Sequence, residues 1–520
     1  MSKSLKSIGV VSFLTLVSRV LALVRDSLAF AIFGAGILYS AFNTAIILPN
    51  LFRRLLAEGS MTAAFVPTLQ EELHAGGRAG TFGLLSKVAS WLLVVTSSLV
   101  LLAMAVFSHA RAVPGHDAKW YLAADLAVLL FPYLALVSLA AAFSATLNVL
   151  EHFVEPALSP IWLNLAMIAT LAGAGLHFSS TPLGEIHWLC AGVLAGGVLQ
   201  MAVPGGVLIA MGWRPRFDLG LSPRVREIAL LMTPGIFGTA IYQINFSVSR
   251  FLAFSLDDSS ATYLYTVNRL MEFPIGVFAV AISTVVYPLI AAHAVKKDFR
   301  AMAGDFQKGI RLILIINLPA AVGLAVLSGP IIRLIYKHGL ATDADIRQMA
   351  LMLSIMVIGL PFFSVVNLTV RAFYAIKDTR TPVRVALVDF VINITATLVL
   401  IHWFGIIGIV LASTTAIIAQ TFLLGRALVR RLPDMHFAPL IPSLAKVLGA
   451  TAAMALVVGA GWQAVRGMHG ASAVAVFGLI PLGVATYGIV LWTLRIEGRS
   501  DIEAMLARVP LVGKFFRPAL

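Results

Sequence analysis

Charge is scarce in this sequence. Only 12% of the 520 residues are Asp, Glu, Lys or Arg, whereas 59% are hydrophobic. Soluble domains carry about a quarter charged residues, so the composition excludes an ordinary soluble protein. The apolar runs are continuous rather than alternating with polar residues, which excludes the strands of an outer-membrane barrel. The sequence therefore predicts an all-α polytopic membrane protein.

Cysteine is almost absent. A single residue, Cys190, excludes an internal disulfide and a thiolate metal site. The basic N-terminus and the apolar run after it are similar to a signal peptide. However, the run contains Arg19 and Arg25 and lacks a small-residue cleavage site, so we interpret it as a retained first helix.

Sequence motifs of enzymes are also missing. The chain has no GxxxxGK[ST] phosphate-binding loop, no HExxH zinc motif and no GxSxG nucleophile elbow. The histidines lack ligand spacing, and we interpret Asp257 and Asp258 as part of a polar turn between two spans. The sequence thus predicts a protein that is not an enzyme and has no metal site or cofactor.

Long apolar runs, separated by polar or Pro/Gly breaks, predict about fourteen transmembrane helices. The expected spans are 8–33, 36–57, 81–108, 120–149, 157–177, 187–211, 226–255, 260–292, 309–329, 346–375, 382–403, 405–429, 441–464 and 471–494. A shorter amphipathic segment, 60–75, is expected to lie at the membrane interface.

The positive charges are distributed unevenly along this predicted topology. With the N-terminus in the cytoplasm, 26 of the 38 Lys and Arg residues fall on the inner side and six on the outer side. This bias follows the positive-inside rule and predicts that both termini are cytoplasmic. It also explains the net charge of +14 without a nucleic acid partner.

A weak internal repeat divides the chain. Segments 148–160 and 374–386 align at an offset that superposes Pro156 on Pro382. We predict a first lobe of six spans at 1–220 and a second lobe at 221–435, related by a parallel repeat. Two further spans and a tail follow at 436–520. Repeated halves around a central site are a common construction of secondary transporters.

Three formal charges lie inside the first span, in SRVLALVRDSLAFAIFG. An Arg at the bilayer centre costs about 2.5–3.5 kcal/mol, so such a side chain is expected to face a water-filled cavity or a partner. Arg19 and Asp26 share one helix face, and Arg25 lies about 120° from Arg19. We expect these residues to form a cavity wall; the alternative is a structural network of Arg19 and Asp26.

Further charges lie near the ends of other spans. Arg53 is expected either to line the cavity or to anchor the topology, while Arg54 is placed to pair with Glu58 at i,i+4. Arg269 is similarly placed to pair with Glu272 at i,i+3.

Such a cavity would be cationic. Cationic walls select an anionic substrate, and the planar guanidinium matches phosphate oxygens. Arg250 and Arg371 are each expected either to line a cavity or to reach the membrane interface along an apolar stem.

Four stretches carry a specific resemblance. SRVLALVRDSLAFAIFGAG, LPNLFRRLLAEGSMTAAFVP, NRLMEFPIGVFAVAISTVVYP and RAFYAIKDTRTPV resemble, in this order, the MurJ (MviN) family of lipid II flippases in the MOP exporter superfamily. The resemblance implies two six-helix lobes around a central cavity with alternating access, and a groove for the polyprenyl tail formed by the last two spans.

The resemblance also assigns residues. It implies substrate binding by Arg19, Arg25, Arg53 and Arg269, and it places the family's acidic residue after the second span on Glu58. Asp26 and Glu272 are expected as further supporting charges.

Several positions depart from the family pattern. Ser40 and Asn268 stand where members often have Asp. Ser249 and Thr397 stand where a sodium site has acids, beside Asn393. We therefore do not predict sodium coupling, and the membrane potential is the candidate driving force.

We expect the chain to flip lipid II, an undecaprenyl-diphosphate-linked disaccharide-pentapeptide, across the bacterial cytoplasmic membrane. Membrane lipids and cell-wall synthesis enzymes are expected as further partners. Three alternatives remain open: a flippase for another polyprenyl-diphosphate oligosaccharide, a non-transporting scaffold for cell-wall enzymes, and a cation–drug antiporter. The antiporter would rely on intramembrane acids rather than arginines.

Overall fold

Helices make up the protein throughout the residues that the computed structural model describes. These are residues 2–56, 60–110, 115, 117–178, 181–276, 280–432 and 434–496, and no strand occurs among them. Two compact units divide the chain: Met1–Thr266 with His338–Asp345 (unit 1), and Val267–Lys337 with Ile346–Leu520 (unit 2). Each is described by itself.

Unit 1 contains the first ten α-helices and the start of the eleventh. They are α1 (Ser2–Phe33), α2 (Ile37–Ala45), α3 (Ile47–Leu56), α4 (Ser60–Ser108), α5 (Ala118–Leu130), α6 (Tyr133–Val149), α7 (Val154–Ile168), α8 (Leu176–Phe178), α9 (Pro182–Ala210), α10 (Pro223–Leu256) and α11 (Ser260–Pro274). A π-helical stretch, Ala169–Gly175, joins α7 to α8.

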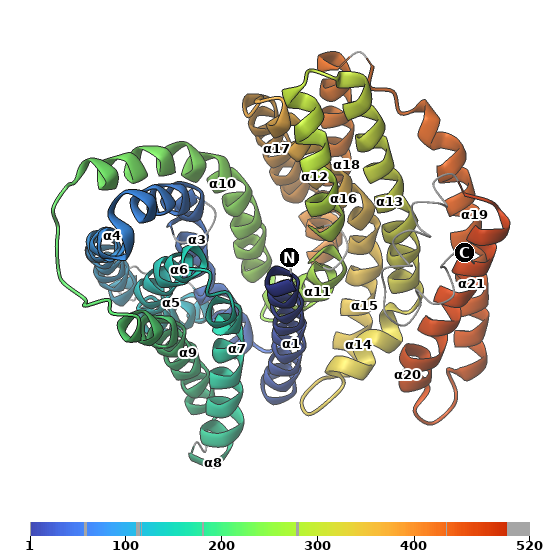
Figure 1. Cartoon of the computed structure of the whole chain (residues 1–520). Helices are drawn as coiled ribbons and strands as arrows, with labels where there is room; N and C mark the ends of the chain where they lie inside the picture. Colours follow the sequence, from blue (N-terminus) through green and yellow to red (C-terminus); the bar gives the residue numbers. More distant parts are fainter. Residues whose placement is uncertain are drawn as a thin grey trace. The chain divides into compact units, whose positions relative to one another are not determined.

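The core of unit 1 lies among α4, α6, α9 and α10. Phe65, Leu69 and Leu85 of α4 are buried there with Phe143 of α6 and with Trp213, which follows α9. The long helix α10 packs against α3 and α4, above which it arches in the view of Figure 1. Helix α7 packs against both α1 and α9, so it holds the first helix to the rest of the unit.

Unit 2 contains the end of α11 and the remaining helices, except that the first residues of α15 belong to unit 1. They are α12 (Val280–Val295), α13 (Phe299–Val326), α14 (Ser328–Tyr336), α15 (Asp343–Met356), α16 (Leu360–Ala375), α17 (Arg380–Phe404), α18 (Ile406–Arg431), α19 (Ile441–Val465), α20 (Ala471–Val474) and α21 (Ile480–Thr493). Shorter helical turns occupy Val357–Gly359, Ala438–Leu440 and Ala475–Leu479.

The main core of unit 2 is formed by α12, α13, α16 and α18. Ile290, Phe306, Ile313, Phe373 and Leu424 are fully buried within it. The two C-terminal helices, α19 and α21, pack against each other, and α19 also packs along α13. The two helices predicted to hold the lipid tail are thus joined to the rest of unit 2 mainly through α13 (Figure 1).

Wherever the structure describes them, the expected spans fall on helices, which confirms the all-α polytopic fold. In the described part of the chain, nine helices are long and apolar enough to cross a membrane, and the pair α5–α6, bent by 41°, makes a tenth. The total of fourteen stays a prediction. The expected spans outside this set are α1, α2–α3, α10 and α11–α12. They carry most of the charged positions singled out from the sequence, whereas Arg371 lies on α16, within the set.

The expected interfacial segment 60–75 continues directly into the next span. Helix α4 runs from Ser60 to Ser108, but Gly77 breaks it with φ 61° and ψ −159°. Only glycine adopts such a backbone conformation readily. The break therefore separates the amphipathic segment from the apolar one.

The linkers aligned by the repeat have the same backbone structure. Glu151 and Lys377, at equivalent positions, both have positive φ, 62° and 61°. Each follows a helix closed by the same pattern of backbone hydrogen bonds, including His152 N to Leu147 O and Asp378 N to Phe373 O. The next helices, α7 and α17, start at equivalent positions. This agreement supports the parallel repeat, while the predicted boundaries at 220 and 435 stay predictions.

Candidate functional site

Helix α1 carries the central pair of the candidate site. Although the sequence places Arg25 and Asp26 in an apolar run, both are buried, with 7% and 3% of their surface exposed. Asp26 Oδ1 accepts hydrogen bonds from Arg25 Nε at 2.9 Å and Nη2 at 2.6 Å. The pair is therefore charge-balanced in this conformation, which lowers the cost of burying the arginine.

Tyr265 of α11 bridges the two charges. Its hydroxyl accepts a hydrogen bond from Arg25 Nη2 at 3.1 Å and donates one to Asp26 Oδ1 at 3.2 Å. The ring of Tyr265 also lies 5.5 Å from the guanidinium of Arg250, which stacks 4.1 Å from the ring of Phe246. A second arginine thus lies beside the pair, held by cation–π contacts.

Helix α7 supplies two further contacts of Arg25. Nη1 donates to Asn164 Oδ1 at 2.9 Å and contacts Met167 Sδ at 3.6 Å. The amide nitrogen of Asn164 donates back to the Ser18 carbonyl oxygen at 3.1 Å. The sequence analysis missed Asn164 and Tyr265, because nothing in a single sequence relates positions 139 and 240 residues from Arg25 to it.

Arg19 and Arg53 belong to the same unit. Arg19 is half-buried on α1, seven residues before Asp26, and the ion pair described for Asp26 is with Arg25. Arg53 Nε, near the end of α3, donates to the neutral amide oxygen of Asn50 at 3.2 Å. Arg54 donates to Gln243 Oε1 of α10 at 3.2 Å. Glu58, its expected partner, lies outside the described residues.

Arg269 belongs to unit 2. Its Nη1 lies 3.1 Å from Glu272 Oε2, as the i,i+3 spacing predicts, and the two side chains are 31% and 44% exposed. The structure does not place Arg269 relative to the three arginines of unit 1, so their joint site stays a prediction.

The positions of the family's sodium site carry neutral groups. Asn393 Oδ1 accepts hydrogen bonds from Ser413 at 3.4 Å and from Thr397 at 3.5 Å. Ser249 Oγ donates to the Asn245 carbonyl in unit 1. Within the described residues, no cluster of three His, Cys, Asp or Glu side chains is arranged to hold a metal ion.

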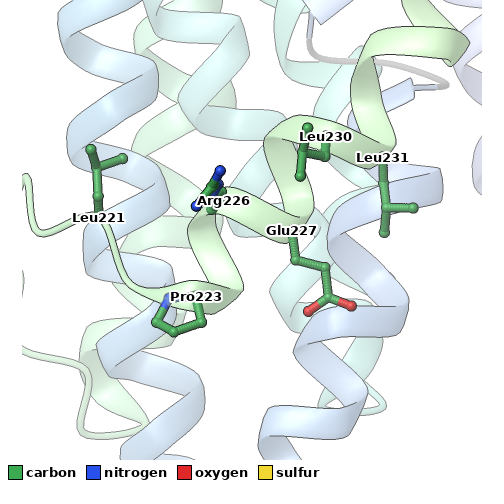
Figure 2. A pocket seen from close by; sticks show the side chains of 6 residues that line it. All are labelled: Leu221, Pro223, Arg226, Glu227, Leu230 and Leu231. Atoms are coloured by element: carbon green, nitrogen blue, oxygen red, sulfur yellow. The ribbon is translucent and has the colours of Figure 1, made fainter.

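A surface hollow lies at the start of α10, and its lining includes neither Arg25 nor Asp26. Figure 2 shows its lining residues, Leu221, Pro223, Arg226, Glu227, Leu230 and Leu231. Glu227 pairs with Arg224 at 3.1 Å, and Arg224 also contacts Glu71 of α4 at 2.6 Å. These hydrogen bonds raise the pKa of Arg224 above its usual value, and they tie α10 to α4.

Comparisons with known proteins agree with this architecture. The family model for lipid II flippase MurJ matches residues 30–476. The probable lipid II flippase MurJ of Haemophilus influenzae is 34% identical over 441 residues, covering 80% of this chain and 84% of that protein. The Vibrio cholerae protein of the same name is 32% identical over 443 residues, covering 82% of each.

Solved structures show the same fold. A lipid II flippase MurJ in an inward closed conformation superposes with a TM-score of 0.75 at 24% identity, covering 95% of this chain and 99% of that one. An inward-facing multidrug MATE transporter of the MOP superfamily superposes with a TM-score of 0.63 at 14% identity, covering 81% and 99%. On the strength of the family match and the relatives above 30% identity, this multi-pass membrane protein belongs to the MurJ family of lipid II flippases.

Proposed function

We propose that the protein moves lipid II from the cytoplasmic to the outer leaflet of the bacterial cytoplasmic membrane by alternating access. Its family and its named relatives support the cargo. The observation that carries the site is Arg25, a buried arginine on α1, the expected first span, whose guanidinium is oriented by partners from three helices. A guanidinium held in this way is suited to a diphosphate.

The diphosphate would be gripped by Arg19, Arg25 and Arg53 of unit 1 together with Arg269 of unit 2. Because Asp26 balances the charge of Arg25 in the described conformation, its carboxylate competes with the phosphate for the positive charge of the guanidinium. Such competition is useful to a transporter, since cargo must be bound in one state and released in another. The closed Arg25–Asp26 pair would correspond to the state that releases cargo.

The driving force would act on these charges. Moving one elementary charge across 100 mV is worth about 2.3 kcal/mol, so the membrane potential can bias a step that moves a charged cavity or cargo. Helices α19 and α21 would hold the polyprenyl tail while the headgroup occupies the cavity.

Complementation tests this proposal. In a strain depleted of its lipid II flippase, the wild-type chain should restore growth, whereas alanine variants of Arg19, Arg25, Arg53 and Arg269 should not. Arg347→Ala, at an exposed position on α15, is the matched control and should complement fully. Full complementation by Arg25→Ala at normal expression would support a scaffold role and contradict transport through this site.

A further inference from the structure

We propose that Asn164 is the positioning residue of the diphosphate site, acting through Arg25. The inference rests on the proposed function, because it assigns a role within the same site. Asn164 is 4% exposed on α7 and is hydrogen-bonded to α1 through both ends of its amide. It has no charge and would not itself attract a phosphate.

The two edges of the Arg25 guanidinium are held differently. Nε and Nη2 face Asp26 and Tyr265, whereas Nη1 faces Asn164 Oδ1 and Met167 Sδ. A guanidinium has five N–H donors, two of them on Nη1, and a thioether sulfur is only a weak acceptor. The N–H directed at Met167 therefore loses least when a phosphate oxygen replaces its partner. Asn164 fixes this donor by holding the other N–H of the same nitrogen.

The amide orientation of Asn164 is determined by helix α1 itself. Its Nδ2 donates to the Ser18 carbonyl, seven residues before Arg25 and two turns along the same helix. The oxygen must then point to Arg25 rather than away from it. The amide spans the space between the backbone of α1 and the guanidinium, so the arginine cannot change rotamer without breaking this bridge.

Helix α7, which contacts α1, also packs closely against α9. A methyl group added at Gly192 would lie 2.8 Å from Met167 Cα, and one at Gly196 would lie 2.9 Å from Leu163 Cα. Small residues four apart allow such close approach of membrane helices. Because α7 is packed between α9 and α1, Asn164 is presented to Arg25 from a rigid support.

Binding of farnesyl diphosphate to the purified full-length chain in detergent tests the role of Asn164. Asn164→Leu keeps the number of side-chain heavy atoms and the branch at Cγ but removes both hydrogen bonds, and it should raise the dissociation constant about tenfold. Asn43→Leu is the matched control: Asn43 is also buried in unit 1, at 3% exposure, and its amide makes no hydrogen bond to any residue that the structure describes. Its dissociation constant for farnesyl diphosphate should stay within about twofold of the wild-type value.

A double-mutant cycle separates positioning from a general structural role. In an Arg25→Lys background the ammonium still pairs with Asp26 but lacks the planar fork, so adding Asn164→Leu should leave the dissociation constant unchanged. Equal weakening by Asn164→Leu in both backgrounds, or no weakening in the wild type, overturns the positioning role. If Asn164→Leu does not fold, Asn164→Ser, whose hydroxyl is too short for the bridge, should give the same non-additive result.

The same experiment distinguishes this inference from the proposed function. If Arg25→Lys and Arg25→Ala bind farnesyl diphosphate as tightly as the wild type, the diphosphate site itself is wrong. If they weaken binding and Asn164→Leu does not, only the role of Asn164 is overturned.

Discussion

The Arg25–Asp26 pair joins side chains that are adjacent in the sequence. Neighbouring residues on a helix point about 100° apart, so their spacing does not predict contact. They meet because the arginine bends back toward the carboxylate, with Tyr265 bonded to both groups. In the proposed function, the pair would combine a guanidinium suited to phosphate with a neighbouring carboxylate that opposes phosphate binding.

Asp26→Asn should separate these two effects. Removing the carboxylate leaves a buried arginine without its ion-pair partner, which typically costs about 3–5 kcal/mol of stability. At the same time it removes the competitor of the diphosphate. We expect a lower melting temperature together with about tenfold tighter binding of farnesyl diphosphate. If Asp26 only stabilised the helix, Asp26→Asn would not bind farnesyl diphosphate more tightly. Weaker binding by this variant would contradict the proposed competition between Asp26 and the diphosphate.

Sequence reasoning identified the charged members of the site and missed its neutral ones. Arg25 and Asp26 stood out because charge in an apolar run is costly. Asn164 lies in an apolar run as well, but a single amide is common in membrane helices and gives no signal of its own. Arg250 was left open because its partners, the rings of Phe246 and Tyr265, become apparent only in the folded unit.

At the scale of elements, the site depends on how closely α7 lies against α9. Gly196 on α9 faces Leu163 Cα, next to Asn164, and leaves no room for a methyl group. Gly196→Ala should therefore displace α7 relative to α1, lower the melting temperature and weaken farnesyl diphosphate binding.

Gly206→Ala on the same helix is the matched control for this substitution. Among the described residues, no atom outside the adjacent turns of α9 lies within 4 Å of the added methyl group, so the melting temperature and the binding should stay at wild-type values. Equal effects of the two substitutions would mean that the loss comes from α9 itself and not from its contact with α7.

The positions of the helices could be predicted from the sequence better than the bends and interruptions within them. Expected spans coincide with helices, yet α2 and α3 separate at Ile46, and the expected span 120–149 bends by 41° between α5 and α6. Such bends depend on packing against neighbours, which hydropathy does not record. By contrast, the linkers at Glu151 and Lys377 were predicted as equivalent, and their shared backbone conformation bears this out.

For the whole molecule, the distribution of positive charge predicts the orientation in the membrane. Cysteine labelling in intact cells tests it with little background, because the single native Cys190 is only 1% exposed. His469→Cys, between α19 and α20, should react with an impermeant maleimide in intact cells. Lys296→Cys, between α12 and α13, should react with the same maleimide only after the membrane is permeabilised. The reverse pattern would invert the predicted topology.

Transport of lipid II through the cationic site is the central claim, and reconstituted vesicles test it most directly. Vesicles that hold the purified chain and lipid II are treated from outside with an enzyme that cleaves the exposed headgroup. After the accessible half is consumed, the wild-type chain should deliver the remainder to the outer leaflet. In vesicles with Arg25→Lys, cleavage should stop after about half of the lipid II is consumed, as in protein-free vesicles. Complete cleavage with Arg25→Lys at the wild-type rate, or a stall with the wild type, would contradict the account.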